Sequence, residues 1–347
     1  MQSYENTKKQ QVSFYDIIGL MKRQVLFIFI TFLFITAYLS AQDRIVSDYS
    51  LRSLLTYQYK TSPLTIQKLA FKNDLQYAYD VSFISMGLTV SARLSVPAIE
   101  LKNIKGIVIM LRGHQHQSNY YTGKGTENPA KRYLEHGWAV IALDFFGYAA
   151  SSPIPSPSFL AQFYSTINAV ELYYSLEQPA FQYHSSVPRS DRIILPEILK
   201  KIVFWGHSNG GQVALHSLEV IQKPVTTVLW APVSLAFPDS AGHYGRGSDW
   251  VDTFKELYTA DDFSLYNFLD KIAGGTRILL HHGDKDTSTP KAWSDALSKA
   301  IEEENLRRDS TGGERIFLRY EVYANANHNL NPYWNTVLPR DAAFWEE

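Results

Sequence analysis

The chain has 347 residues, of which 45% are hydrophobic and 19% are charged, and its formal net charge is −1. This composition allows a large buried core and excludes intrinsic disorder, and the near-zero charge excludes the basic surface of a general nucleic-acid binder. The sequence contains no cysteine, which excludes disulfides, thiolate zinc sites and a cysteine nucleophile.

The N-terminal segment predicts export. A basic pair precedes Val25–Tyr38, an apolar run that suits a signal peptide and is shorter than the roughly 20 residues that span a bilayer. Ala41 is a small residue suited to the position before a cleavage site. We expect residues 1–41 to be a signal peptide, with Met21 as the candidate true start. The mature protein would then be periplasmic or extracellular without stable membrane insertion, and the alternative is an uncleaved N-terminal anchor.

Residues 42–347 alternate strand and helix patterns, which predicts a single α/β domain with a mostly parallel sheet and helices on both faces. Residues 234–271 form a long irregular insertion and are a candidate cap over a site. In chain order we expect a helix and then a loop in Asp48–Lys72, a hairpin in Asp80–Pro97, strands at Ile104–Leu111, Trp138–Asp144, Ile202–Trp205, Thr226–Trp230, Arg277–His281 and Arg315–Tyr323, and helices at Ala130–His136, Phe159–Glu177, Asn209–Ile221 and Lys291–Glu304.

The motif with the clearest chemistry is Gly206-His207-Ser208-Asn209-Gly210, which fits the pattern Gly-x-Ser-x-Gly. It follows an expected strand and opens an expected helix, as the sharp turn called the nucleophile elbow requires. Glycine suits this turn because side chains would collide with the strand and the helix. The helix N-terminus also brings a positive dipole near Ser208. We predict that Ser208 is a nucleophile; the alternative is an ordinary glycine-rich turn.

A serine hydroxyl needs a base to take its proton and an acid to orient that base. In the fold that carries the elbow, the acid follows a later strand and the histidine follows the last one. His328 is the only histidine after Asp286, and it lies just past the last expected strand. Asp284 and Asp286 both follow the preceding strand. Asp286 is the favoured acid, and the other aspartate would cap the helix that starts near Pro290.

The negative charge that develops on an attacked carbonyl needs two hydrogen-bond donors, which form an oxyanion hole. The backbone N–H of Asn209 is one candidate, because it follows the nucleophile. The second is the N–H of His114, with Gln115 as the alternative. Both follow Gly113, which lets the backbone come close to a substrate.

The remaining histidines do not predict a metal site. His281 and His282 are expected to be structural, because adjacent strand residues point to opposite faces and cannot hold one ion. A site at His114 and His116 is not expected either. We therefore predict no metal and no cofactor.

From about Asp80 onward the sequence resembles the α/β-hydrolase superfamily, and within it the catalytic domain of the prolyl oligopeptidase family of serine peptidases. GHSNGGQVAL resembles the family's nucleophile segment, and HHGDKDTSTP resembles its acid segment, which implies Asp286 as the acid. LDFFGYAASSP resembles a strand-end segment of the family, with Ala149 in place of the usual second glycine. Asp144 in that segment is expected to bind loop backbone.

Two features depart from the family. Too few residues precede the catalytic part for the family's β-propeller, and Arg112-Gly113-His114 stands where many members have Tyr-Gly-Gly. In place of that tyrosine, either Arg112 or the backbone alone would donate to the oxyanion. Stand-alone members similar to this chain include esterases as well as peptidases.

We therefore expect a serine hydrolase that forms an acyl-enzyme and acts on small peptides. The alternative is a hydrolase of small or sugar-linked carboxylic esters, because an acyl-enzyme serves amide and ester cleavage alike. A more distant alternative is a non-catalytic binding protein on a hydrolase scaffold. That class is usually marked by a missing catalytic residue, and here Ser208, Asp286 and His328 are all present.

Overall fold

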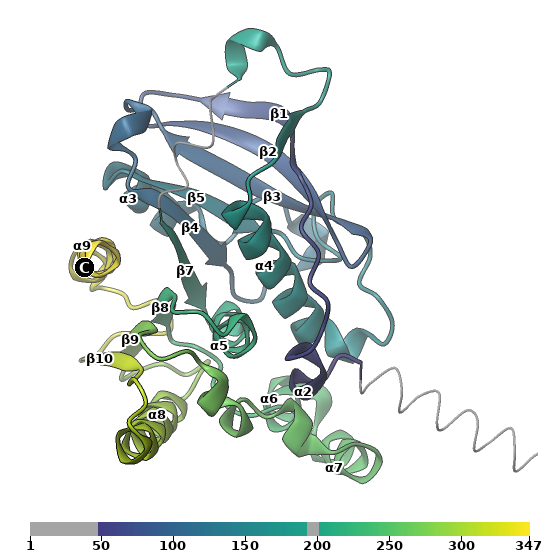
Figure 1. Ribbon diagram of the computed structural model, residues 1–347, viewed down its shortest axis with the longest axis vertical. Coiled ribbons are helices and arrows are strands. Elements are labelled where there is room, and N and C mark those ends of the chain that lie inside the picture. The colour runs from purple at the N-terminus through teal and green to yellow at the C-terminus, as the bar shows by residue number, and fades with distance from the viewer. Residues whose placement is uncertain (1–47, 193–200) are drawn as a thin grey trace, which may run out of the picture. The chain divides into compact units, whose positions relative to one another are not determined.

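A ten-stranded sheet forms the centre of the protein in the computed structural model, which describes residues 48–192 and 201–347 (Figure 1). The expected signal peptide, residues 1–41, lies outside the described residues. No helix within the described ranges is long and apolar enough to cross a membrane. The strands are β1 (Leu64–Lys72), β2 (Gln76–Ser85), β3 (Leu88–Pro97), β4 (Gly106–Leu111), β5 (Trp138–Leu143), β6 (Phe181–Tyr183), β7 (Ile202–His207), β8 (Thr226–Trp230), β9 (Arg277–Gly283) and β10 (Phe317–Tyr323).

The order of the strands across the sheet is β10-β9-β8-β7-β4-β5-β3-β2-β1-β6. The six strands from β10 to β5 pair in parallel, which confirms the predicted mostly parallel sheet. Every residue of β4 and of β5 is buried, which explains their continuous apolar sequences. Because parallel strands end at the same edge of a sheet, the loops after β4, β7, β9 and β10 meet there.

The remainder of the sheet is largely antiparallel. β1, β2 and β3 form a meander, β3 pairs with β5 in antiparallel fashion, and the short β6 lies parallel to β1 at the far edge. The predicted hairpin in Asp80–Pro97 is confirmed, and it turns at Met86 and Gly87, both with positive φ.

The expectation of a helix followed by a loop in Asp48–Lys72 is wrong in its second half, where β1 lies. Only Leu51–Leu54 is helical, as α2. Register shifts between Ile66 and Lys68, and again three residues later, interrupt the pairing of β1 with β2. Such bulges break the alternation of inward and outward side chains that identifies a strand in a sequence.

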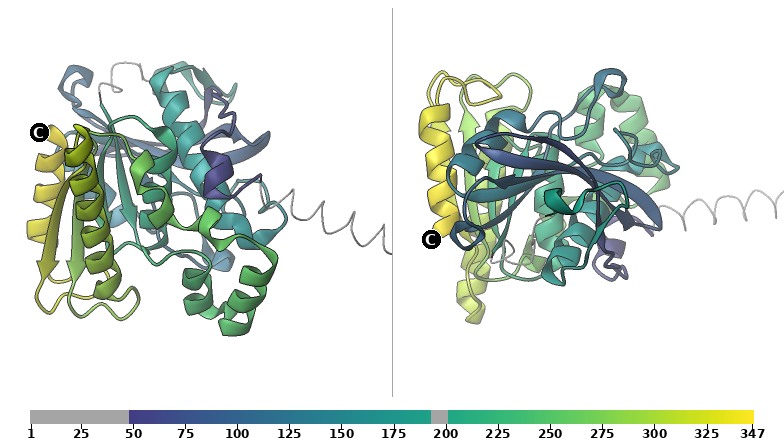
Figure 2. Two further views of the ribbon diagram at one scale, coloured as in Figure 1. Left: turned by 60° about the horizontal axis from the view of Figure 1, so that its bottom comes forward. Right: turned by 90° about the horizontal axis from the view of Figure 1, so that it is seen from above.

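Helices cover both faces of the sheet (Figures 1 and 2). Two consecutive residues of β9 show the two sides, because His281 hydrogen-bonds Asp341 of one helix and His282 hydrogen-bonds Ser294 of another. α3 and α9 pack together on the side of His281, and α4, α5 and α8 cover the other face. The helices are α3 (Glu127–Glu135), α4 (Ala161–Glu177), α5 (Asn209–Ile221), α6 (Asp239–Ala241), α7 (Ser248–Leu257), α8 (Lys291–Thr311) and α9 (Trp334–Glu346).

The insertion at residues 234–271 contains α6, a π-helical turn, α7 and three short 3₁₀ turns. Its aromatic side chains pack against the segment before α4, as in the pair of Trp250 and Phe159, whose ring centroids are 5.9 Å apart. Tyr244 of the insertion donates its hydroxyl to the carbonyl oxygen of Ser288 at 2.9 Å. The insertion thereby reaches the loop that follows β9.

Candidate active site

Ser208 lies in the sharp turn between β7 and α5. Its backbone has φ 56° and ψ −122°, a conformation that is strained for any residue other than glycine. A Cβ atom on Gly206 would lie 2.6 Å from the carbonyl oxygen of Gly210, and one on Gly210 would lie 1.9 Å from that of Leu111. Only glycine fits at these two positions, so the turn has the geometry of a nucleophile elbow.

His328 follows β10 and Asp286 follows β9, at the same edge of the sheet as Ser208. The Nδ1 atom of His328 lies 2.8 Å from the Oδ2 atom of Asp286. The side chain of Asp286 is fully buried and that of His328 is 19% exposed. None of the described residues hydrogen-bonds the Nε2 atom of His328, so this nitrogen is available for proton transfer.

The two aspartates that the sequence left open have different partners. Asp286 pairs with His328, whereas Asp284 accepts the backbone N–H of Asn325 at 2.6 Å and fastens the turn after β10. The expected aspartate cap on the helix near Pro290 is wrong, because α8 begins without a side-chain cap.

The carboxylate of Asp286 is surrounded by donors. It accepts the backbone N–H groups of Ser288 at 2.8 Å and of Thr289 at 3.0 Å, and the Thr289 hydroxyl at 2.6 Å. The Nε2 atom of His282 lies 3.2 Å away. Burial alone would raise the pKa of Asp286, but hydrogen bonds from His282, His328 and Thr289 hold it below its ordinary value. The group therefore stays ionised and can stabilise a positive His328.

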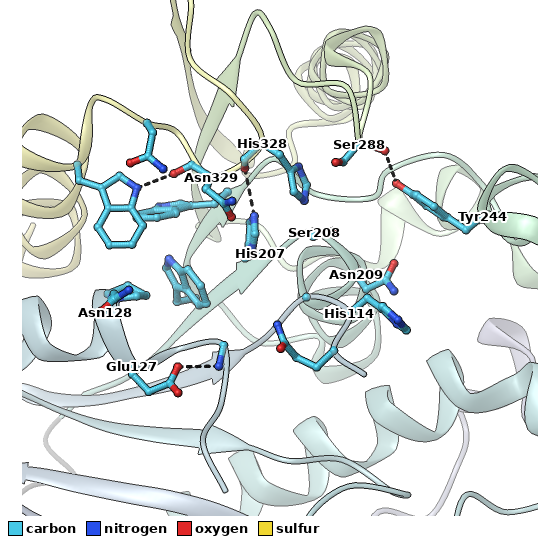
Figure 3. A pocket seen from close by; sticks show the side chains of 18 residues that line it. His114, Glu127, Asn128, His207, Ser208, Asn209, Tyr244, Ser288, His328 and Asn329 are labelled. Carbon is cyan, nitrogen blue, oxygen red and sulfur yellow. Dashed lines mark hydrogen bonds between the residues drawn. The ribbon is translucent and has the colours of Figure 1, made fainter. Parts of the chain in front are cut away.

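Ser208 and His328 line one cavity of about 880 Å³. In Figure 3, Ser208 sits at the start of the helix, with His328 to one side and the side chains of His114 and Asn209 next to it. Polar and aromatic side chains make up most of the rest of the wall. The polar side chains are Gln115, Glu127, Asn128, Ser288, Asn329 and Asn331, and the aromatic ones are Trp205, Trp230, Tyr244 and Trp334.

No family model matches this sequence, and no curated protein matches it. Solved structures do match. Acetyl xylan esterase 1 from Thermoanaerobacterium sp. JW/SL YS485 aligns with a TM-score of 0.59 and 14% identity, over 86% of this chain and 93% of its own. Est1E from Butyrivibrio proteoclasticus, solved with ferulic acid, aligns with a TM-score of 0.54 and 16% identity, over 76% of this chain and 96% of its own.

A peptidase also matches. Dipeptidyl peptidase 4 from Porphyromonas gingivalis aligns with a TM-score of 0.56 and 15% identity, over 78% of this chain but 35% of its own. The sheet order, the elbow after β7 and these alignments agree. The chain has the α/β-hydrolase fold. The fold class expected from the sequence is therefore confirmed, and at these identities the alignments show the fold alone.

In this α/β-hydrolase fold the loop after β4 lies against the elbow. A Cβ atom on Gly113 would be 3.1 Å from the Cβ atom of Ser208. His114 and Asn209 line the cavity, and neither of their backbone N–H groups donates to a described residue. Both N–H groups are therefore available as oxyanion donors. Gln115, the alternative, also lines the cavity.

His207 is a site residue that sequence reasoning missed. Its Nε2 atom lies 3.2 Å from the backbone carbonyl oxygen of His328. Burial, together with the nearby His328, lowers the pKa of His207 to about 4. The neutral ring therefore donates its N–H to this carbonyl and fastens the loop that carries His328. The motif gave no signal for it, because the pattern leaves the residue before the serine open.

The side chains expected to be structural have structural contacts. His281 and His282 face opposite sides of the sheet, as predicted. Asp144 accepts the backbone N–H of Gly123 at 2.9 Å, as expected for a residue that binds loop backbone. Within residues 48–192 and 201–347, no group of three or more histidine, aspartate or glutamate side chains is placed to hold a metal ion.

Proposed function

We propose that this protein is a serine hydrolase with Ser208 as the nucleophile, His328 as the general base and Asp286 as the acid that orients the base. The observation that carries the proposal is the 2.8 Å pair of Asp286 and His328, which opens on the cavity that Ser208 also lines. The strained backbone of Ser208 supports it, because strain of this kind gathers at functional sites.

In the proposed reaction the Oγ atom of Ser208 attacks the acyl carbon while the Nε2 atom of His328 takes the hydroxyl proton. Asp286 stabilises the imidazolium that results. The N–H groups of Asn209 and His114 bind the tetrahedral oxyanion. The imidazolium passes its proton to the leaving group, and water then attacks the acyl-enzyme by the same steps, with His328 again as the base. The chemistry of this residue set needs no metal or cofactor.

We propose carboxylic esters as the first substrate class. The two esterases align over 93% and 96% of their own lengths, whereas the dipeptidyl peptidase aligns over 35%. These alignments over nearly the full length of two esterases support esters as the class to test first, although the sequence resemblance placed peptides first.

The cavity wall suits an ester whose leaving group carries hydroxyls, such as a sugar. Trp334 presents a half-buried ring, and the exposed Glu127, Asn128 and Asn329 supply a carboxylate and two amides beside it. A sugar ring offers C–H groups on its face for an aromatic ring and hydroxyls on its edge for polar side chains.

Peptides are the second candidate. The segments GHSNGGQVAL and HHGDKDTSTP resemble those of a peptidase family, and 78% of this chain aligns with a dipeptidyl peptidase. Since the acyl-enzyme is common to both reactions, the substrate has to be decided by measurement.

The decisive experiment compares the parent protein with Ser208→Ala on a nitrophenyl acetate, an acetylated xylo-oligosaccharide and a prolyl-nitroanilide peptide. We expect Ser208→Ala to lower kcat/KM by about 10⁴-fold or more, with cleavage of the esters and not of the anilide. Ser217→Ala is the matched control, because Ser217 lies buried in the same helix and donates to the carbonyl of Val213. Equal rates in the parent and Ser208→Ala would contradict the proposal and favour a binding protein.

A further inference from the structure

Arg112 lies at the end of β4, directly before the loop that carries His114. It is 4% exposed. Its Nε donates to the hydroxyl of Tyr120 at 3.0 Å, its Nη2 to the carbonyl oxygen of Asp144 at 2.7 Å, and its Nη1 to the carbonyl oxygen of Gly113 at 3.0 Å. The guanidinium also lies 4.0 Å from the centre of the Tyr148 ring. These contacts hold the planar group in one orientation.

The bond to Gly113 sets the direction of the next peptide. A trans peptide is planar, so the carbonyl of Gly113 and the N–H of His114 point in opposite directions. The carbonyl faces the buried guanidinium, and the N–H therefore faces away from it. His114 lies beside Ser208 in the cavity wall, and no described residue accepts its N–H.

We propose that Arg112 is the residue that positions the oxyanion donor of His114, by holding the Gly113 carbonyl away from the cavity. The inference rests on the proposed function, because an oxyanion forms only if Ser208 attacks a carbonyl. Rotation of the Gly113–His114 peptide would turn a carbonyl oxygen toward the cavity in place of the N–H. The oxyanion would then face the negative end of the peptide dipole. The guanidinium of Arg112 does not itself donate to the oxyanion, since its N–H groups donate to Tyr120, Gly113 and Asp144. Arg112 acts instead by positioning the N–H of His114.

The hydroxyl of Tyr120 also holds the guanidinium of Arg112 in place. It accepts from Arg112 and donates to the Oδ1 atom of Asp144 at 2.8 Å. Tyr148 holds a second carbonyl of the loop, because its hydroxyl donates to the carbonyl oxygen of Gln115 at 2.9 Å. The loop that carries the proposed donor is therefore held at two carbonyls, those of Gly113 and Gln115, on either side of His114.

The first test is Arg112→Lys, which keeps the positive charge but cannot bind the carbonyls of Gly113 and Asp144 with one planar group. We expect kcat to fall by about 10²- to 10³-fold, as when one oxyanion donor is lost, with little change in KM. The readout specific to the oxyanion is the ratio of rates on an oxoester and on the matching thionoester. Sulfur is a weaker hydrogen-bond acceptor than oxygen, so the parent should prefer the oxoester and Arg112→Lys should lose most of that preference.

The matched control is Arg308→Lys. Arg308 is 7% exposed and donates to the carbonyl oxygens of Ile272 at 2.6 Å and Glu314 at 3.1 Å, outside the cavity wall. Its loss should lower the melting temperature and leave the oxoester-to-thionoester ratio at the parent value. A ratio that falls equally in both variants would overturn the proposal.

A milder pair keeps the test decisive if Arg112→Lys does not fold. Tyr120→Phe removes the hydroxyl that holds the guanidinium, and Tyr133→Phe removes a hydroxyl that donates to another buried carboxylate, that of Asp341 at 2.7 Å. We expect the ratio to fall in Tyr120→Phe and to stay unchanged in Tyr133→Phe. Ser208-dependent hydrolysis with a parental ratio in Tyr120→Phe or in folded Arg112→Lys would overturn the role of Arg112 alone. Hydrolysis that persists in Ser208→Ala would overturn the proposed function, and the role of Arg112 with it.

Discussion

Two histidine–aspartate pairs near β9 share a separation of 2.8 Å, and they differ in what surrounds the second nitrogen of the histidine ring. His281 lies 2.8 Å from Asp341, and His328 lies 2.8 Å from Asp286. Both carboxylates are fully buried. The pairs cannot be told apart by distance or by the burial of the acid.

The environment of the histidine separates them. His281 is fully buried, and its other nitrogen lies 2.9 Å from the hydroxyl of Tyr323. His328 is partly exposed, and its Nε2 faces the cavity without a described partner. A carboxylate–imidazole pair can do acid–base chemistry only where one nitrogen stays available to a substrate, so the closed pair holds the fold together and the open pair suits proton transfer.

The closed pair belongs to a larger network. Asp341 also accepts the hydroxyl of Tyr133 at 2.7 Å and the indole N–H of Trp230 at 2.9 Å. These bonds link α3, β8 and β9 to α9. Each hydrogen bond that the Asp341 carboxylate accepts comes from a buried side chain. A buried carboxylate stabilises a fold when buried donors satisfy it in this way.

The largest expected effect is that of Asp286→Asn in the open pair. An asparagine can donate to the Nδ1 atom of His328 and so stabilise the wrong tautomer of the base. We expect kcat per folded molecule to fall by about 10⁴-fold, measured by steady-state kinetics. The unfolding free energy, measured by urea denaturation, should fall as well, because the amide cannot accept every donor that surrounds Asp286. A variant that retains most of its kcat would show that the two pairs do not differ in function.

The same substitution in the closed pair, Asp341→Asn, should act on stability alone. Its amide cannot accept all three donors, and the unpaired groups stay buried. We expect the unfolding free energy to fall by about 3–5 kcal/mol, while kcat per folded molecule stays close to that of the parent. A loss of kcat in a folded Asp341→Asn protein would show that the closed pair also affects catalysis, which would contradict its purely structural role.

The smallest expected effect concerns His207, which fastens the loop of the open pair. Burial lowers its pKa from 6.5 to about 4, so the unfolded chain binds a proton that the folded protein does not. Stability from this source is complete above pH 6.5 and is lost as the pH falls to about 4. His207→Gln retains a donor for the His328 carbonyl. Its melting temperature should change less than that of the parent protein between pH 6.5 and about 4.

The control for that profile is His184→Gln, which replaces an exposed histidine and should follow the parent curve. Parallel curves for the parent and His207→Gln would contradict the assignment of a neutral His207 ring.

The sequence predicted the parts of the fold that are written in local patterns. The continuous apolar runs of the central strands and the glycines around Ser208 reflect sterics that act within a few residues. β1 was not predicted because its bulges disturb the alternation of apolar and polar residues. α9 was not predicted because Pro339 interrupts its helical pattern. The three-residue β6 is too short to give a pattern at all.

The candidate site divides in the same way. Ser208, Asp286 and His328 follow from a motif and from the order of strands. The contacts of His207 and Arg112 do not, because they depend on how distant segments pack. His207 and the carbonyl that it binds are 121 positions apart in the chain, and no local pattern encodes such a contact.

That separation along the chain also bears on how the protein matures. The elbow forms where β7 meets α5, but its proposed base arrives only after β10, the last strand of the chain and one edge of the sheet. Pairings between distant segments form late and slowly during folding. A chain leaving the ribosome therefore carries an inert serine until its C-terminal part has docked, so recovered hydrolysis would report completion of the whole sheet.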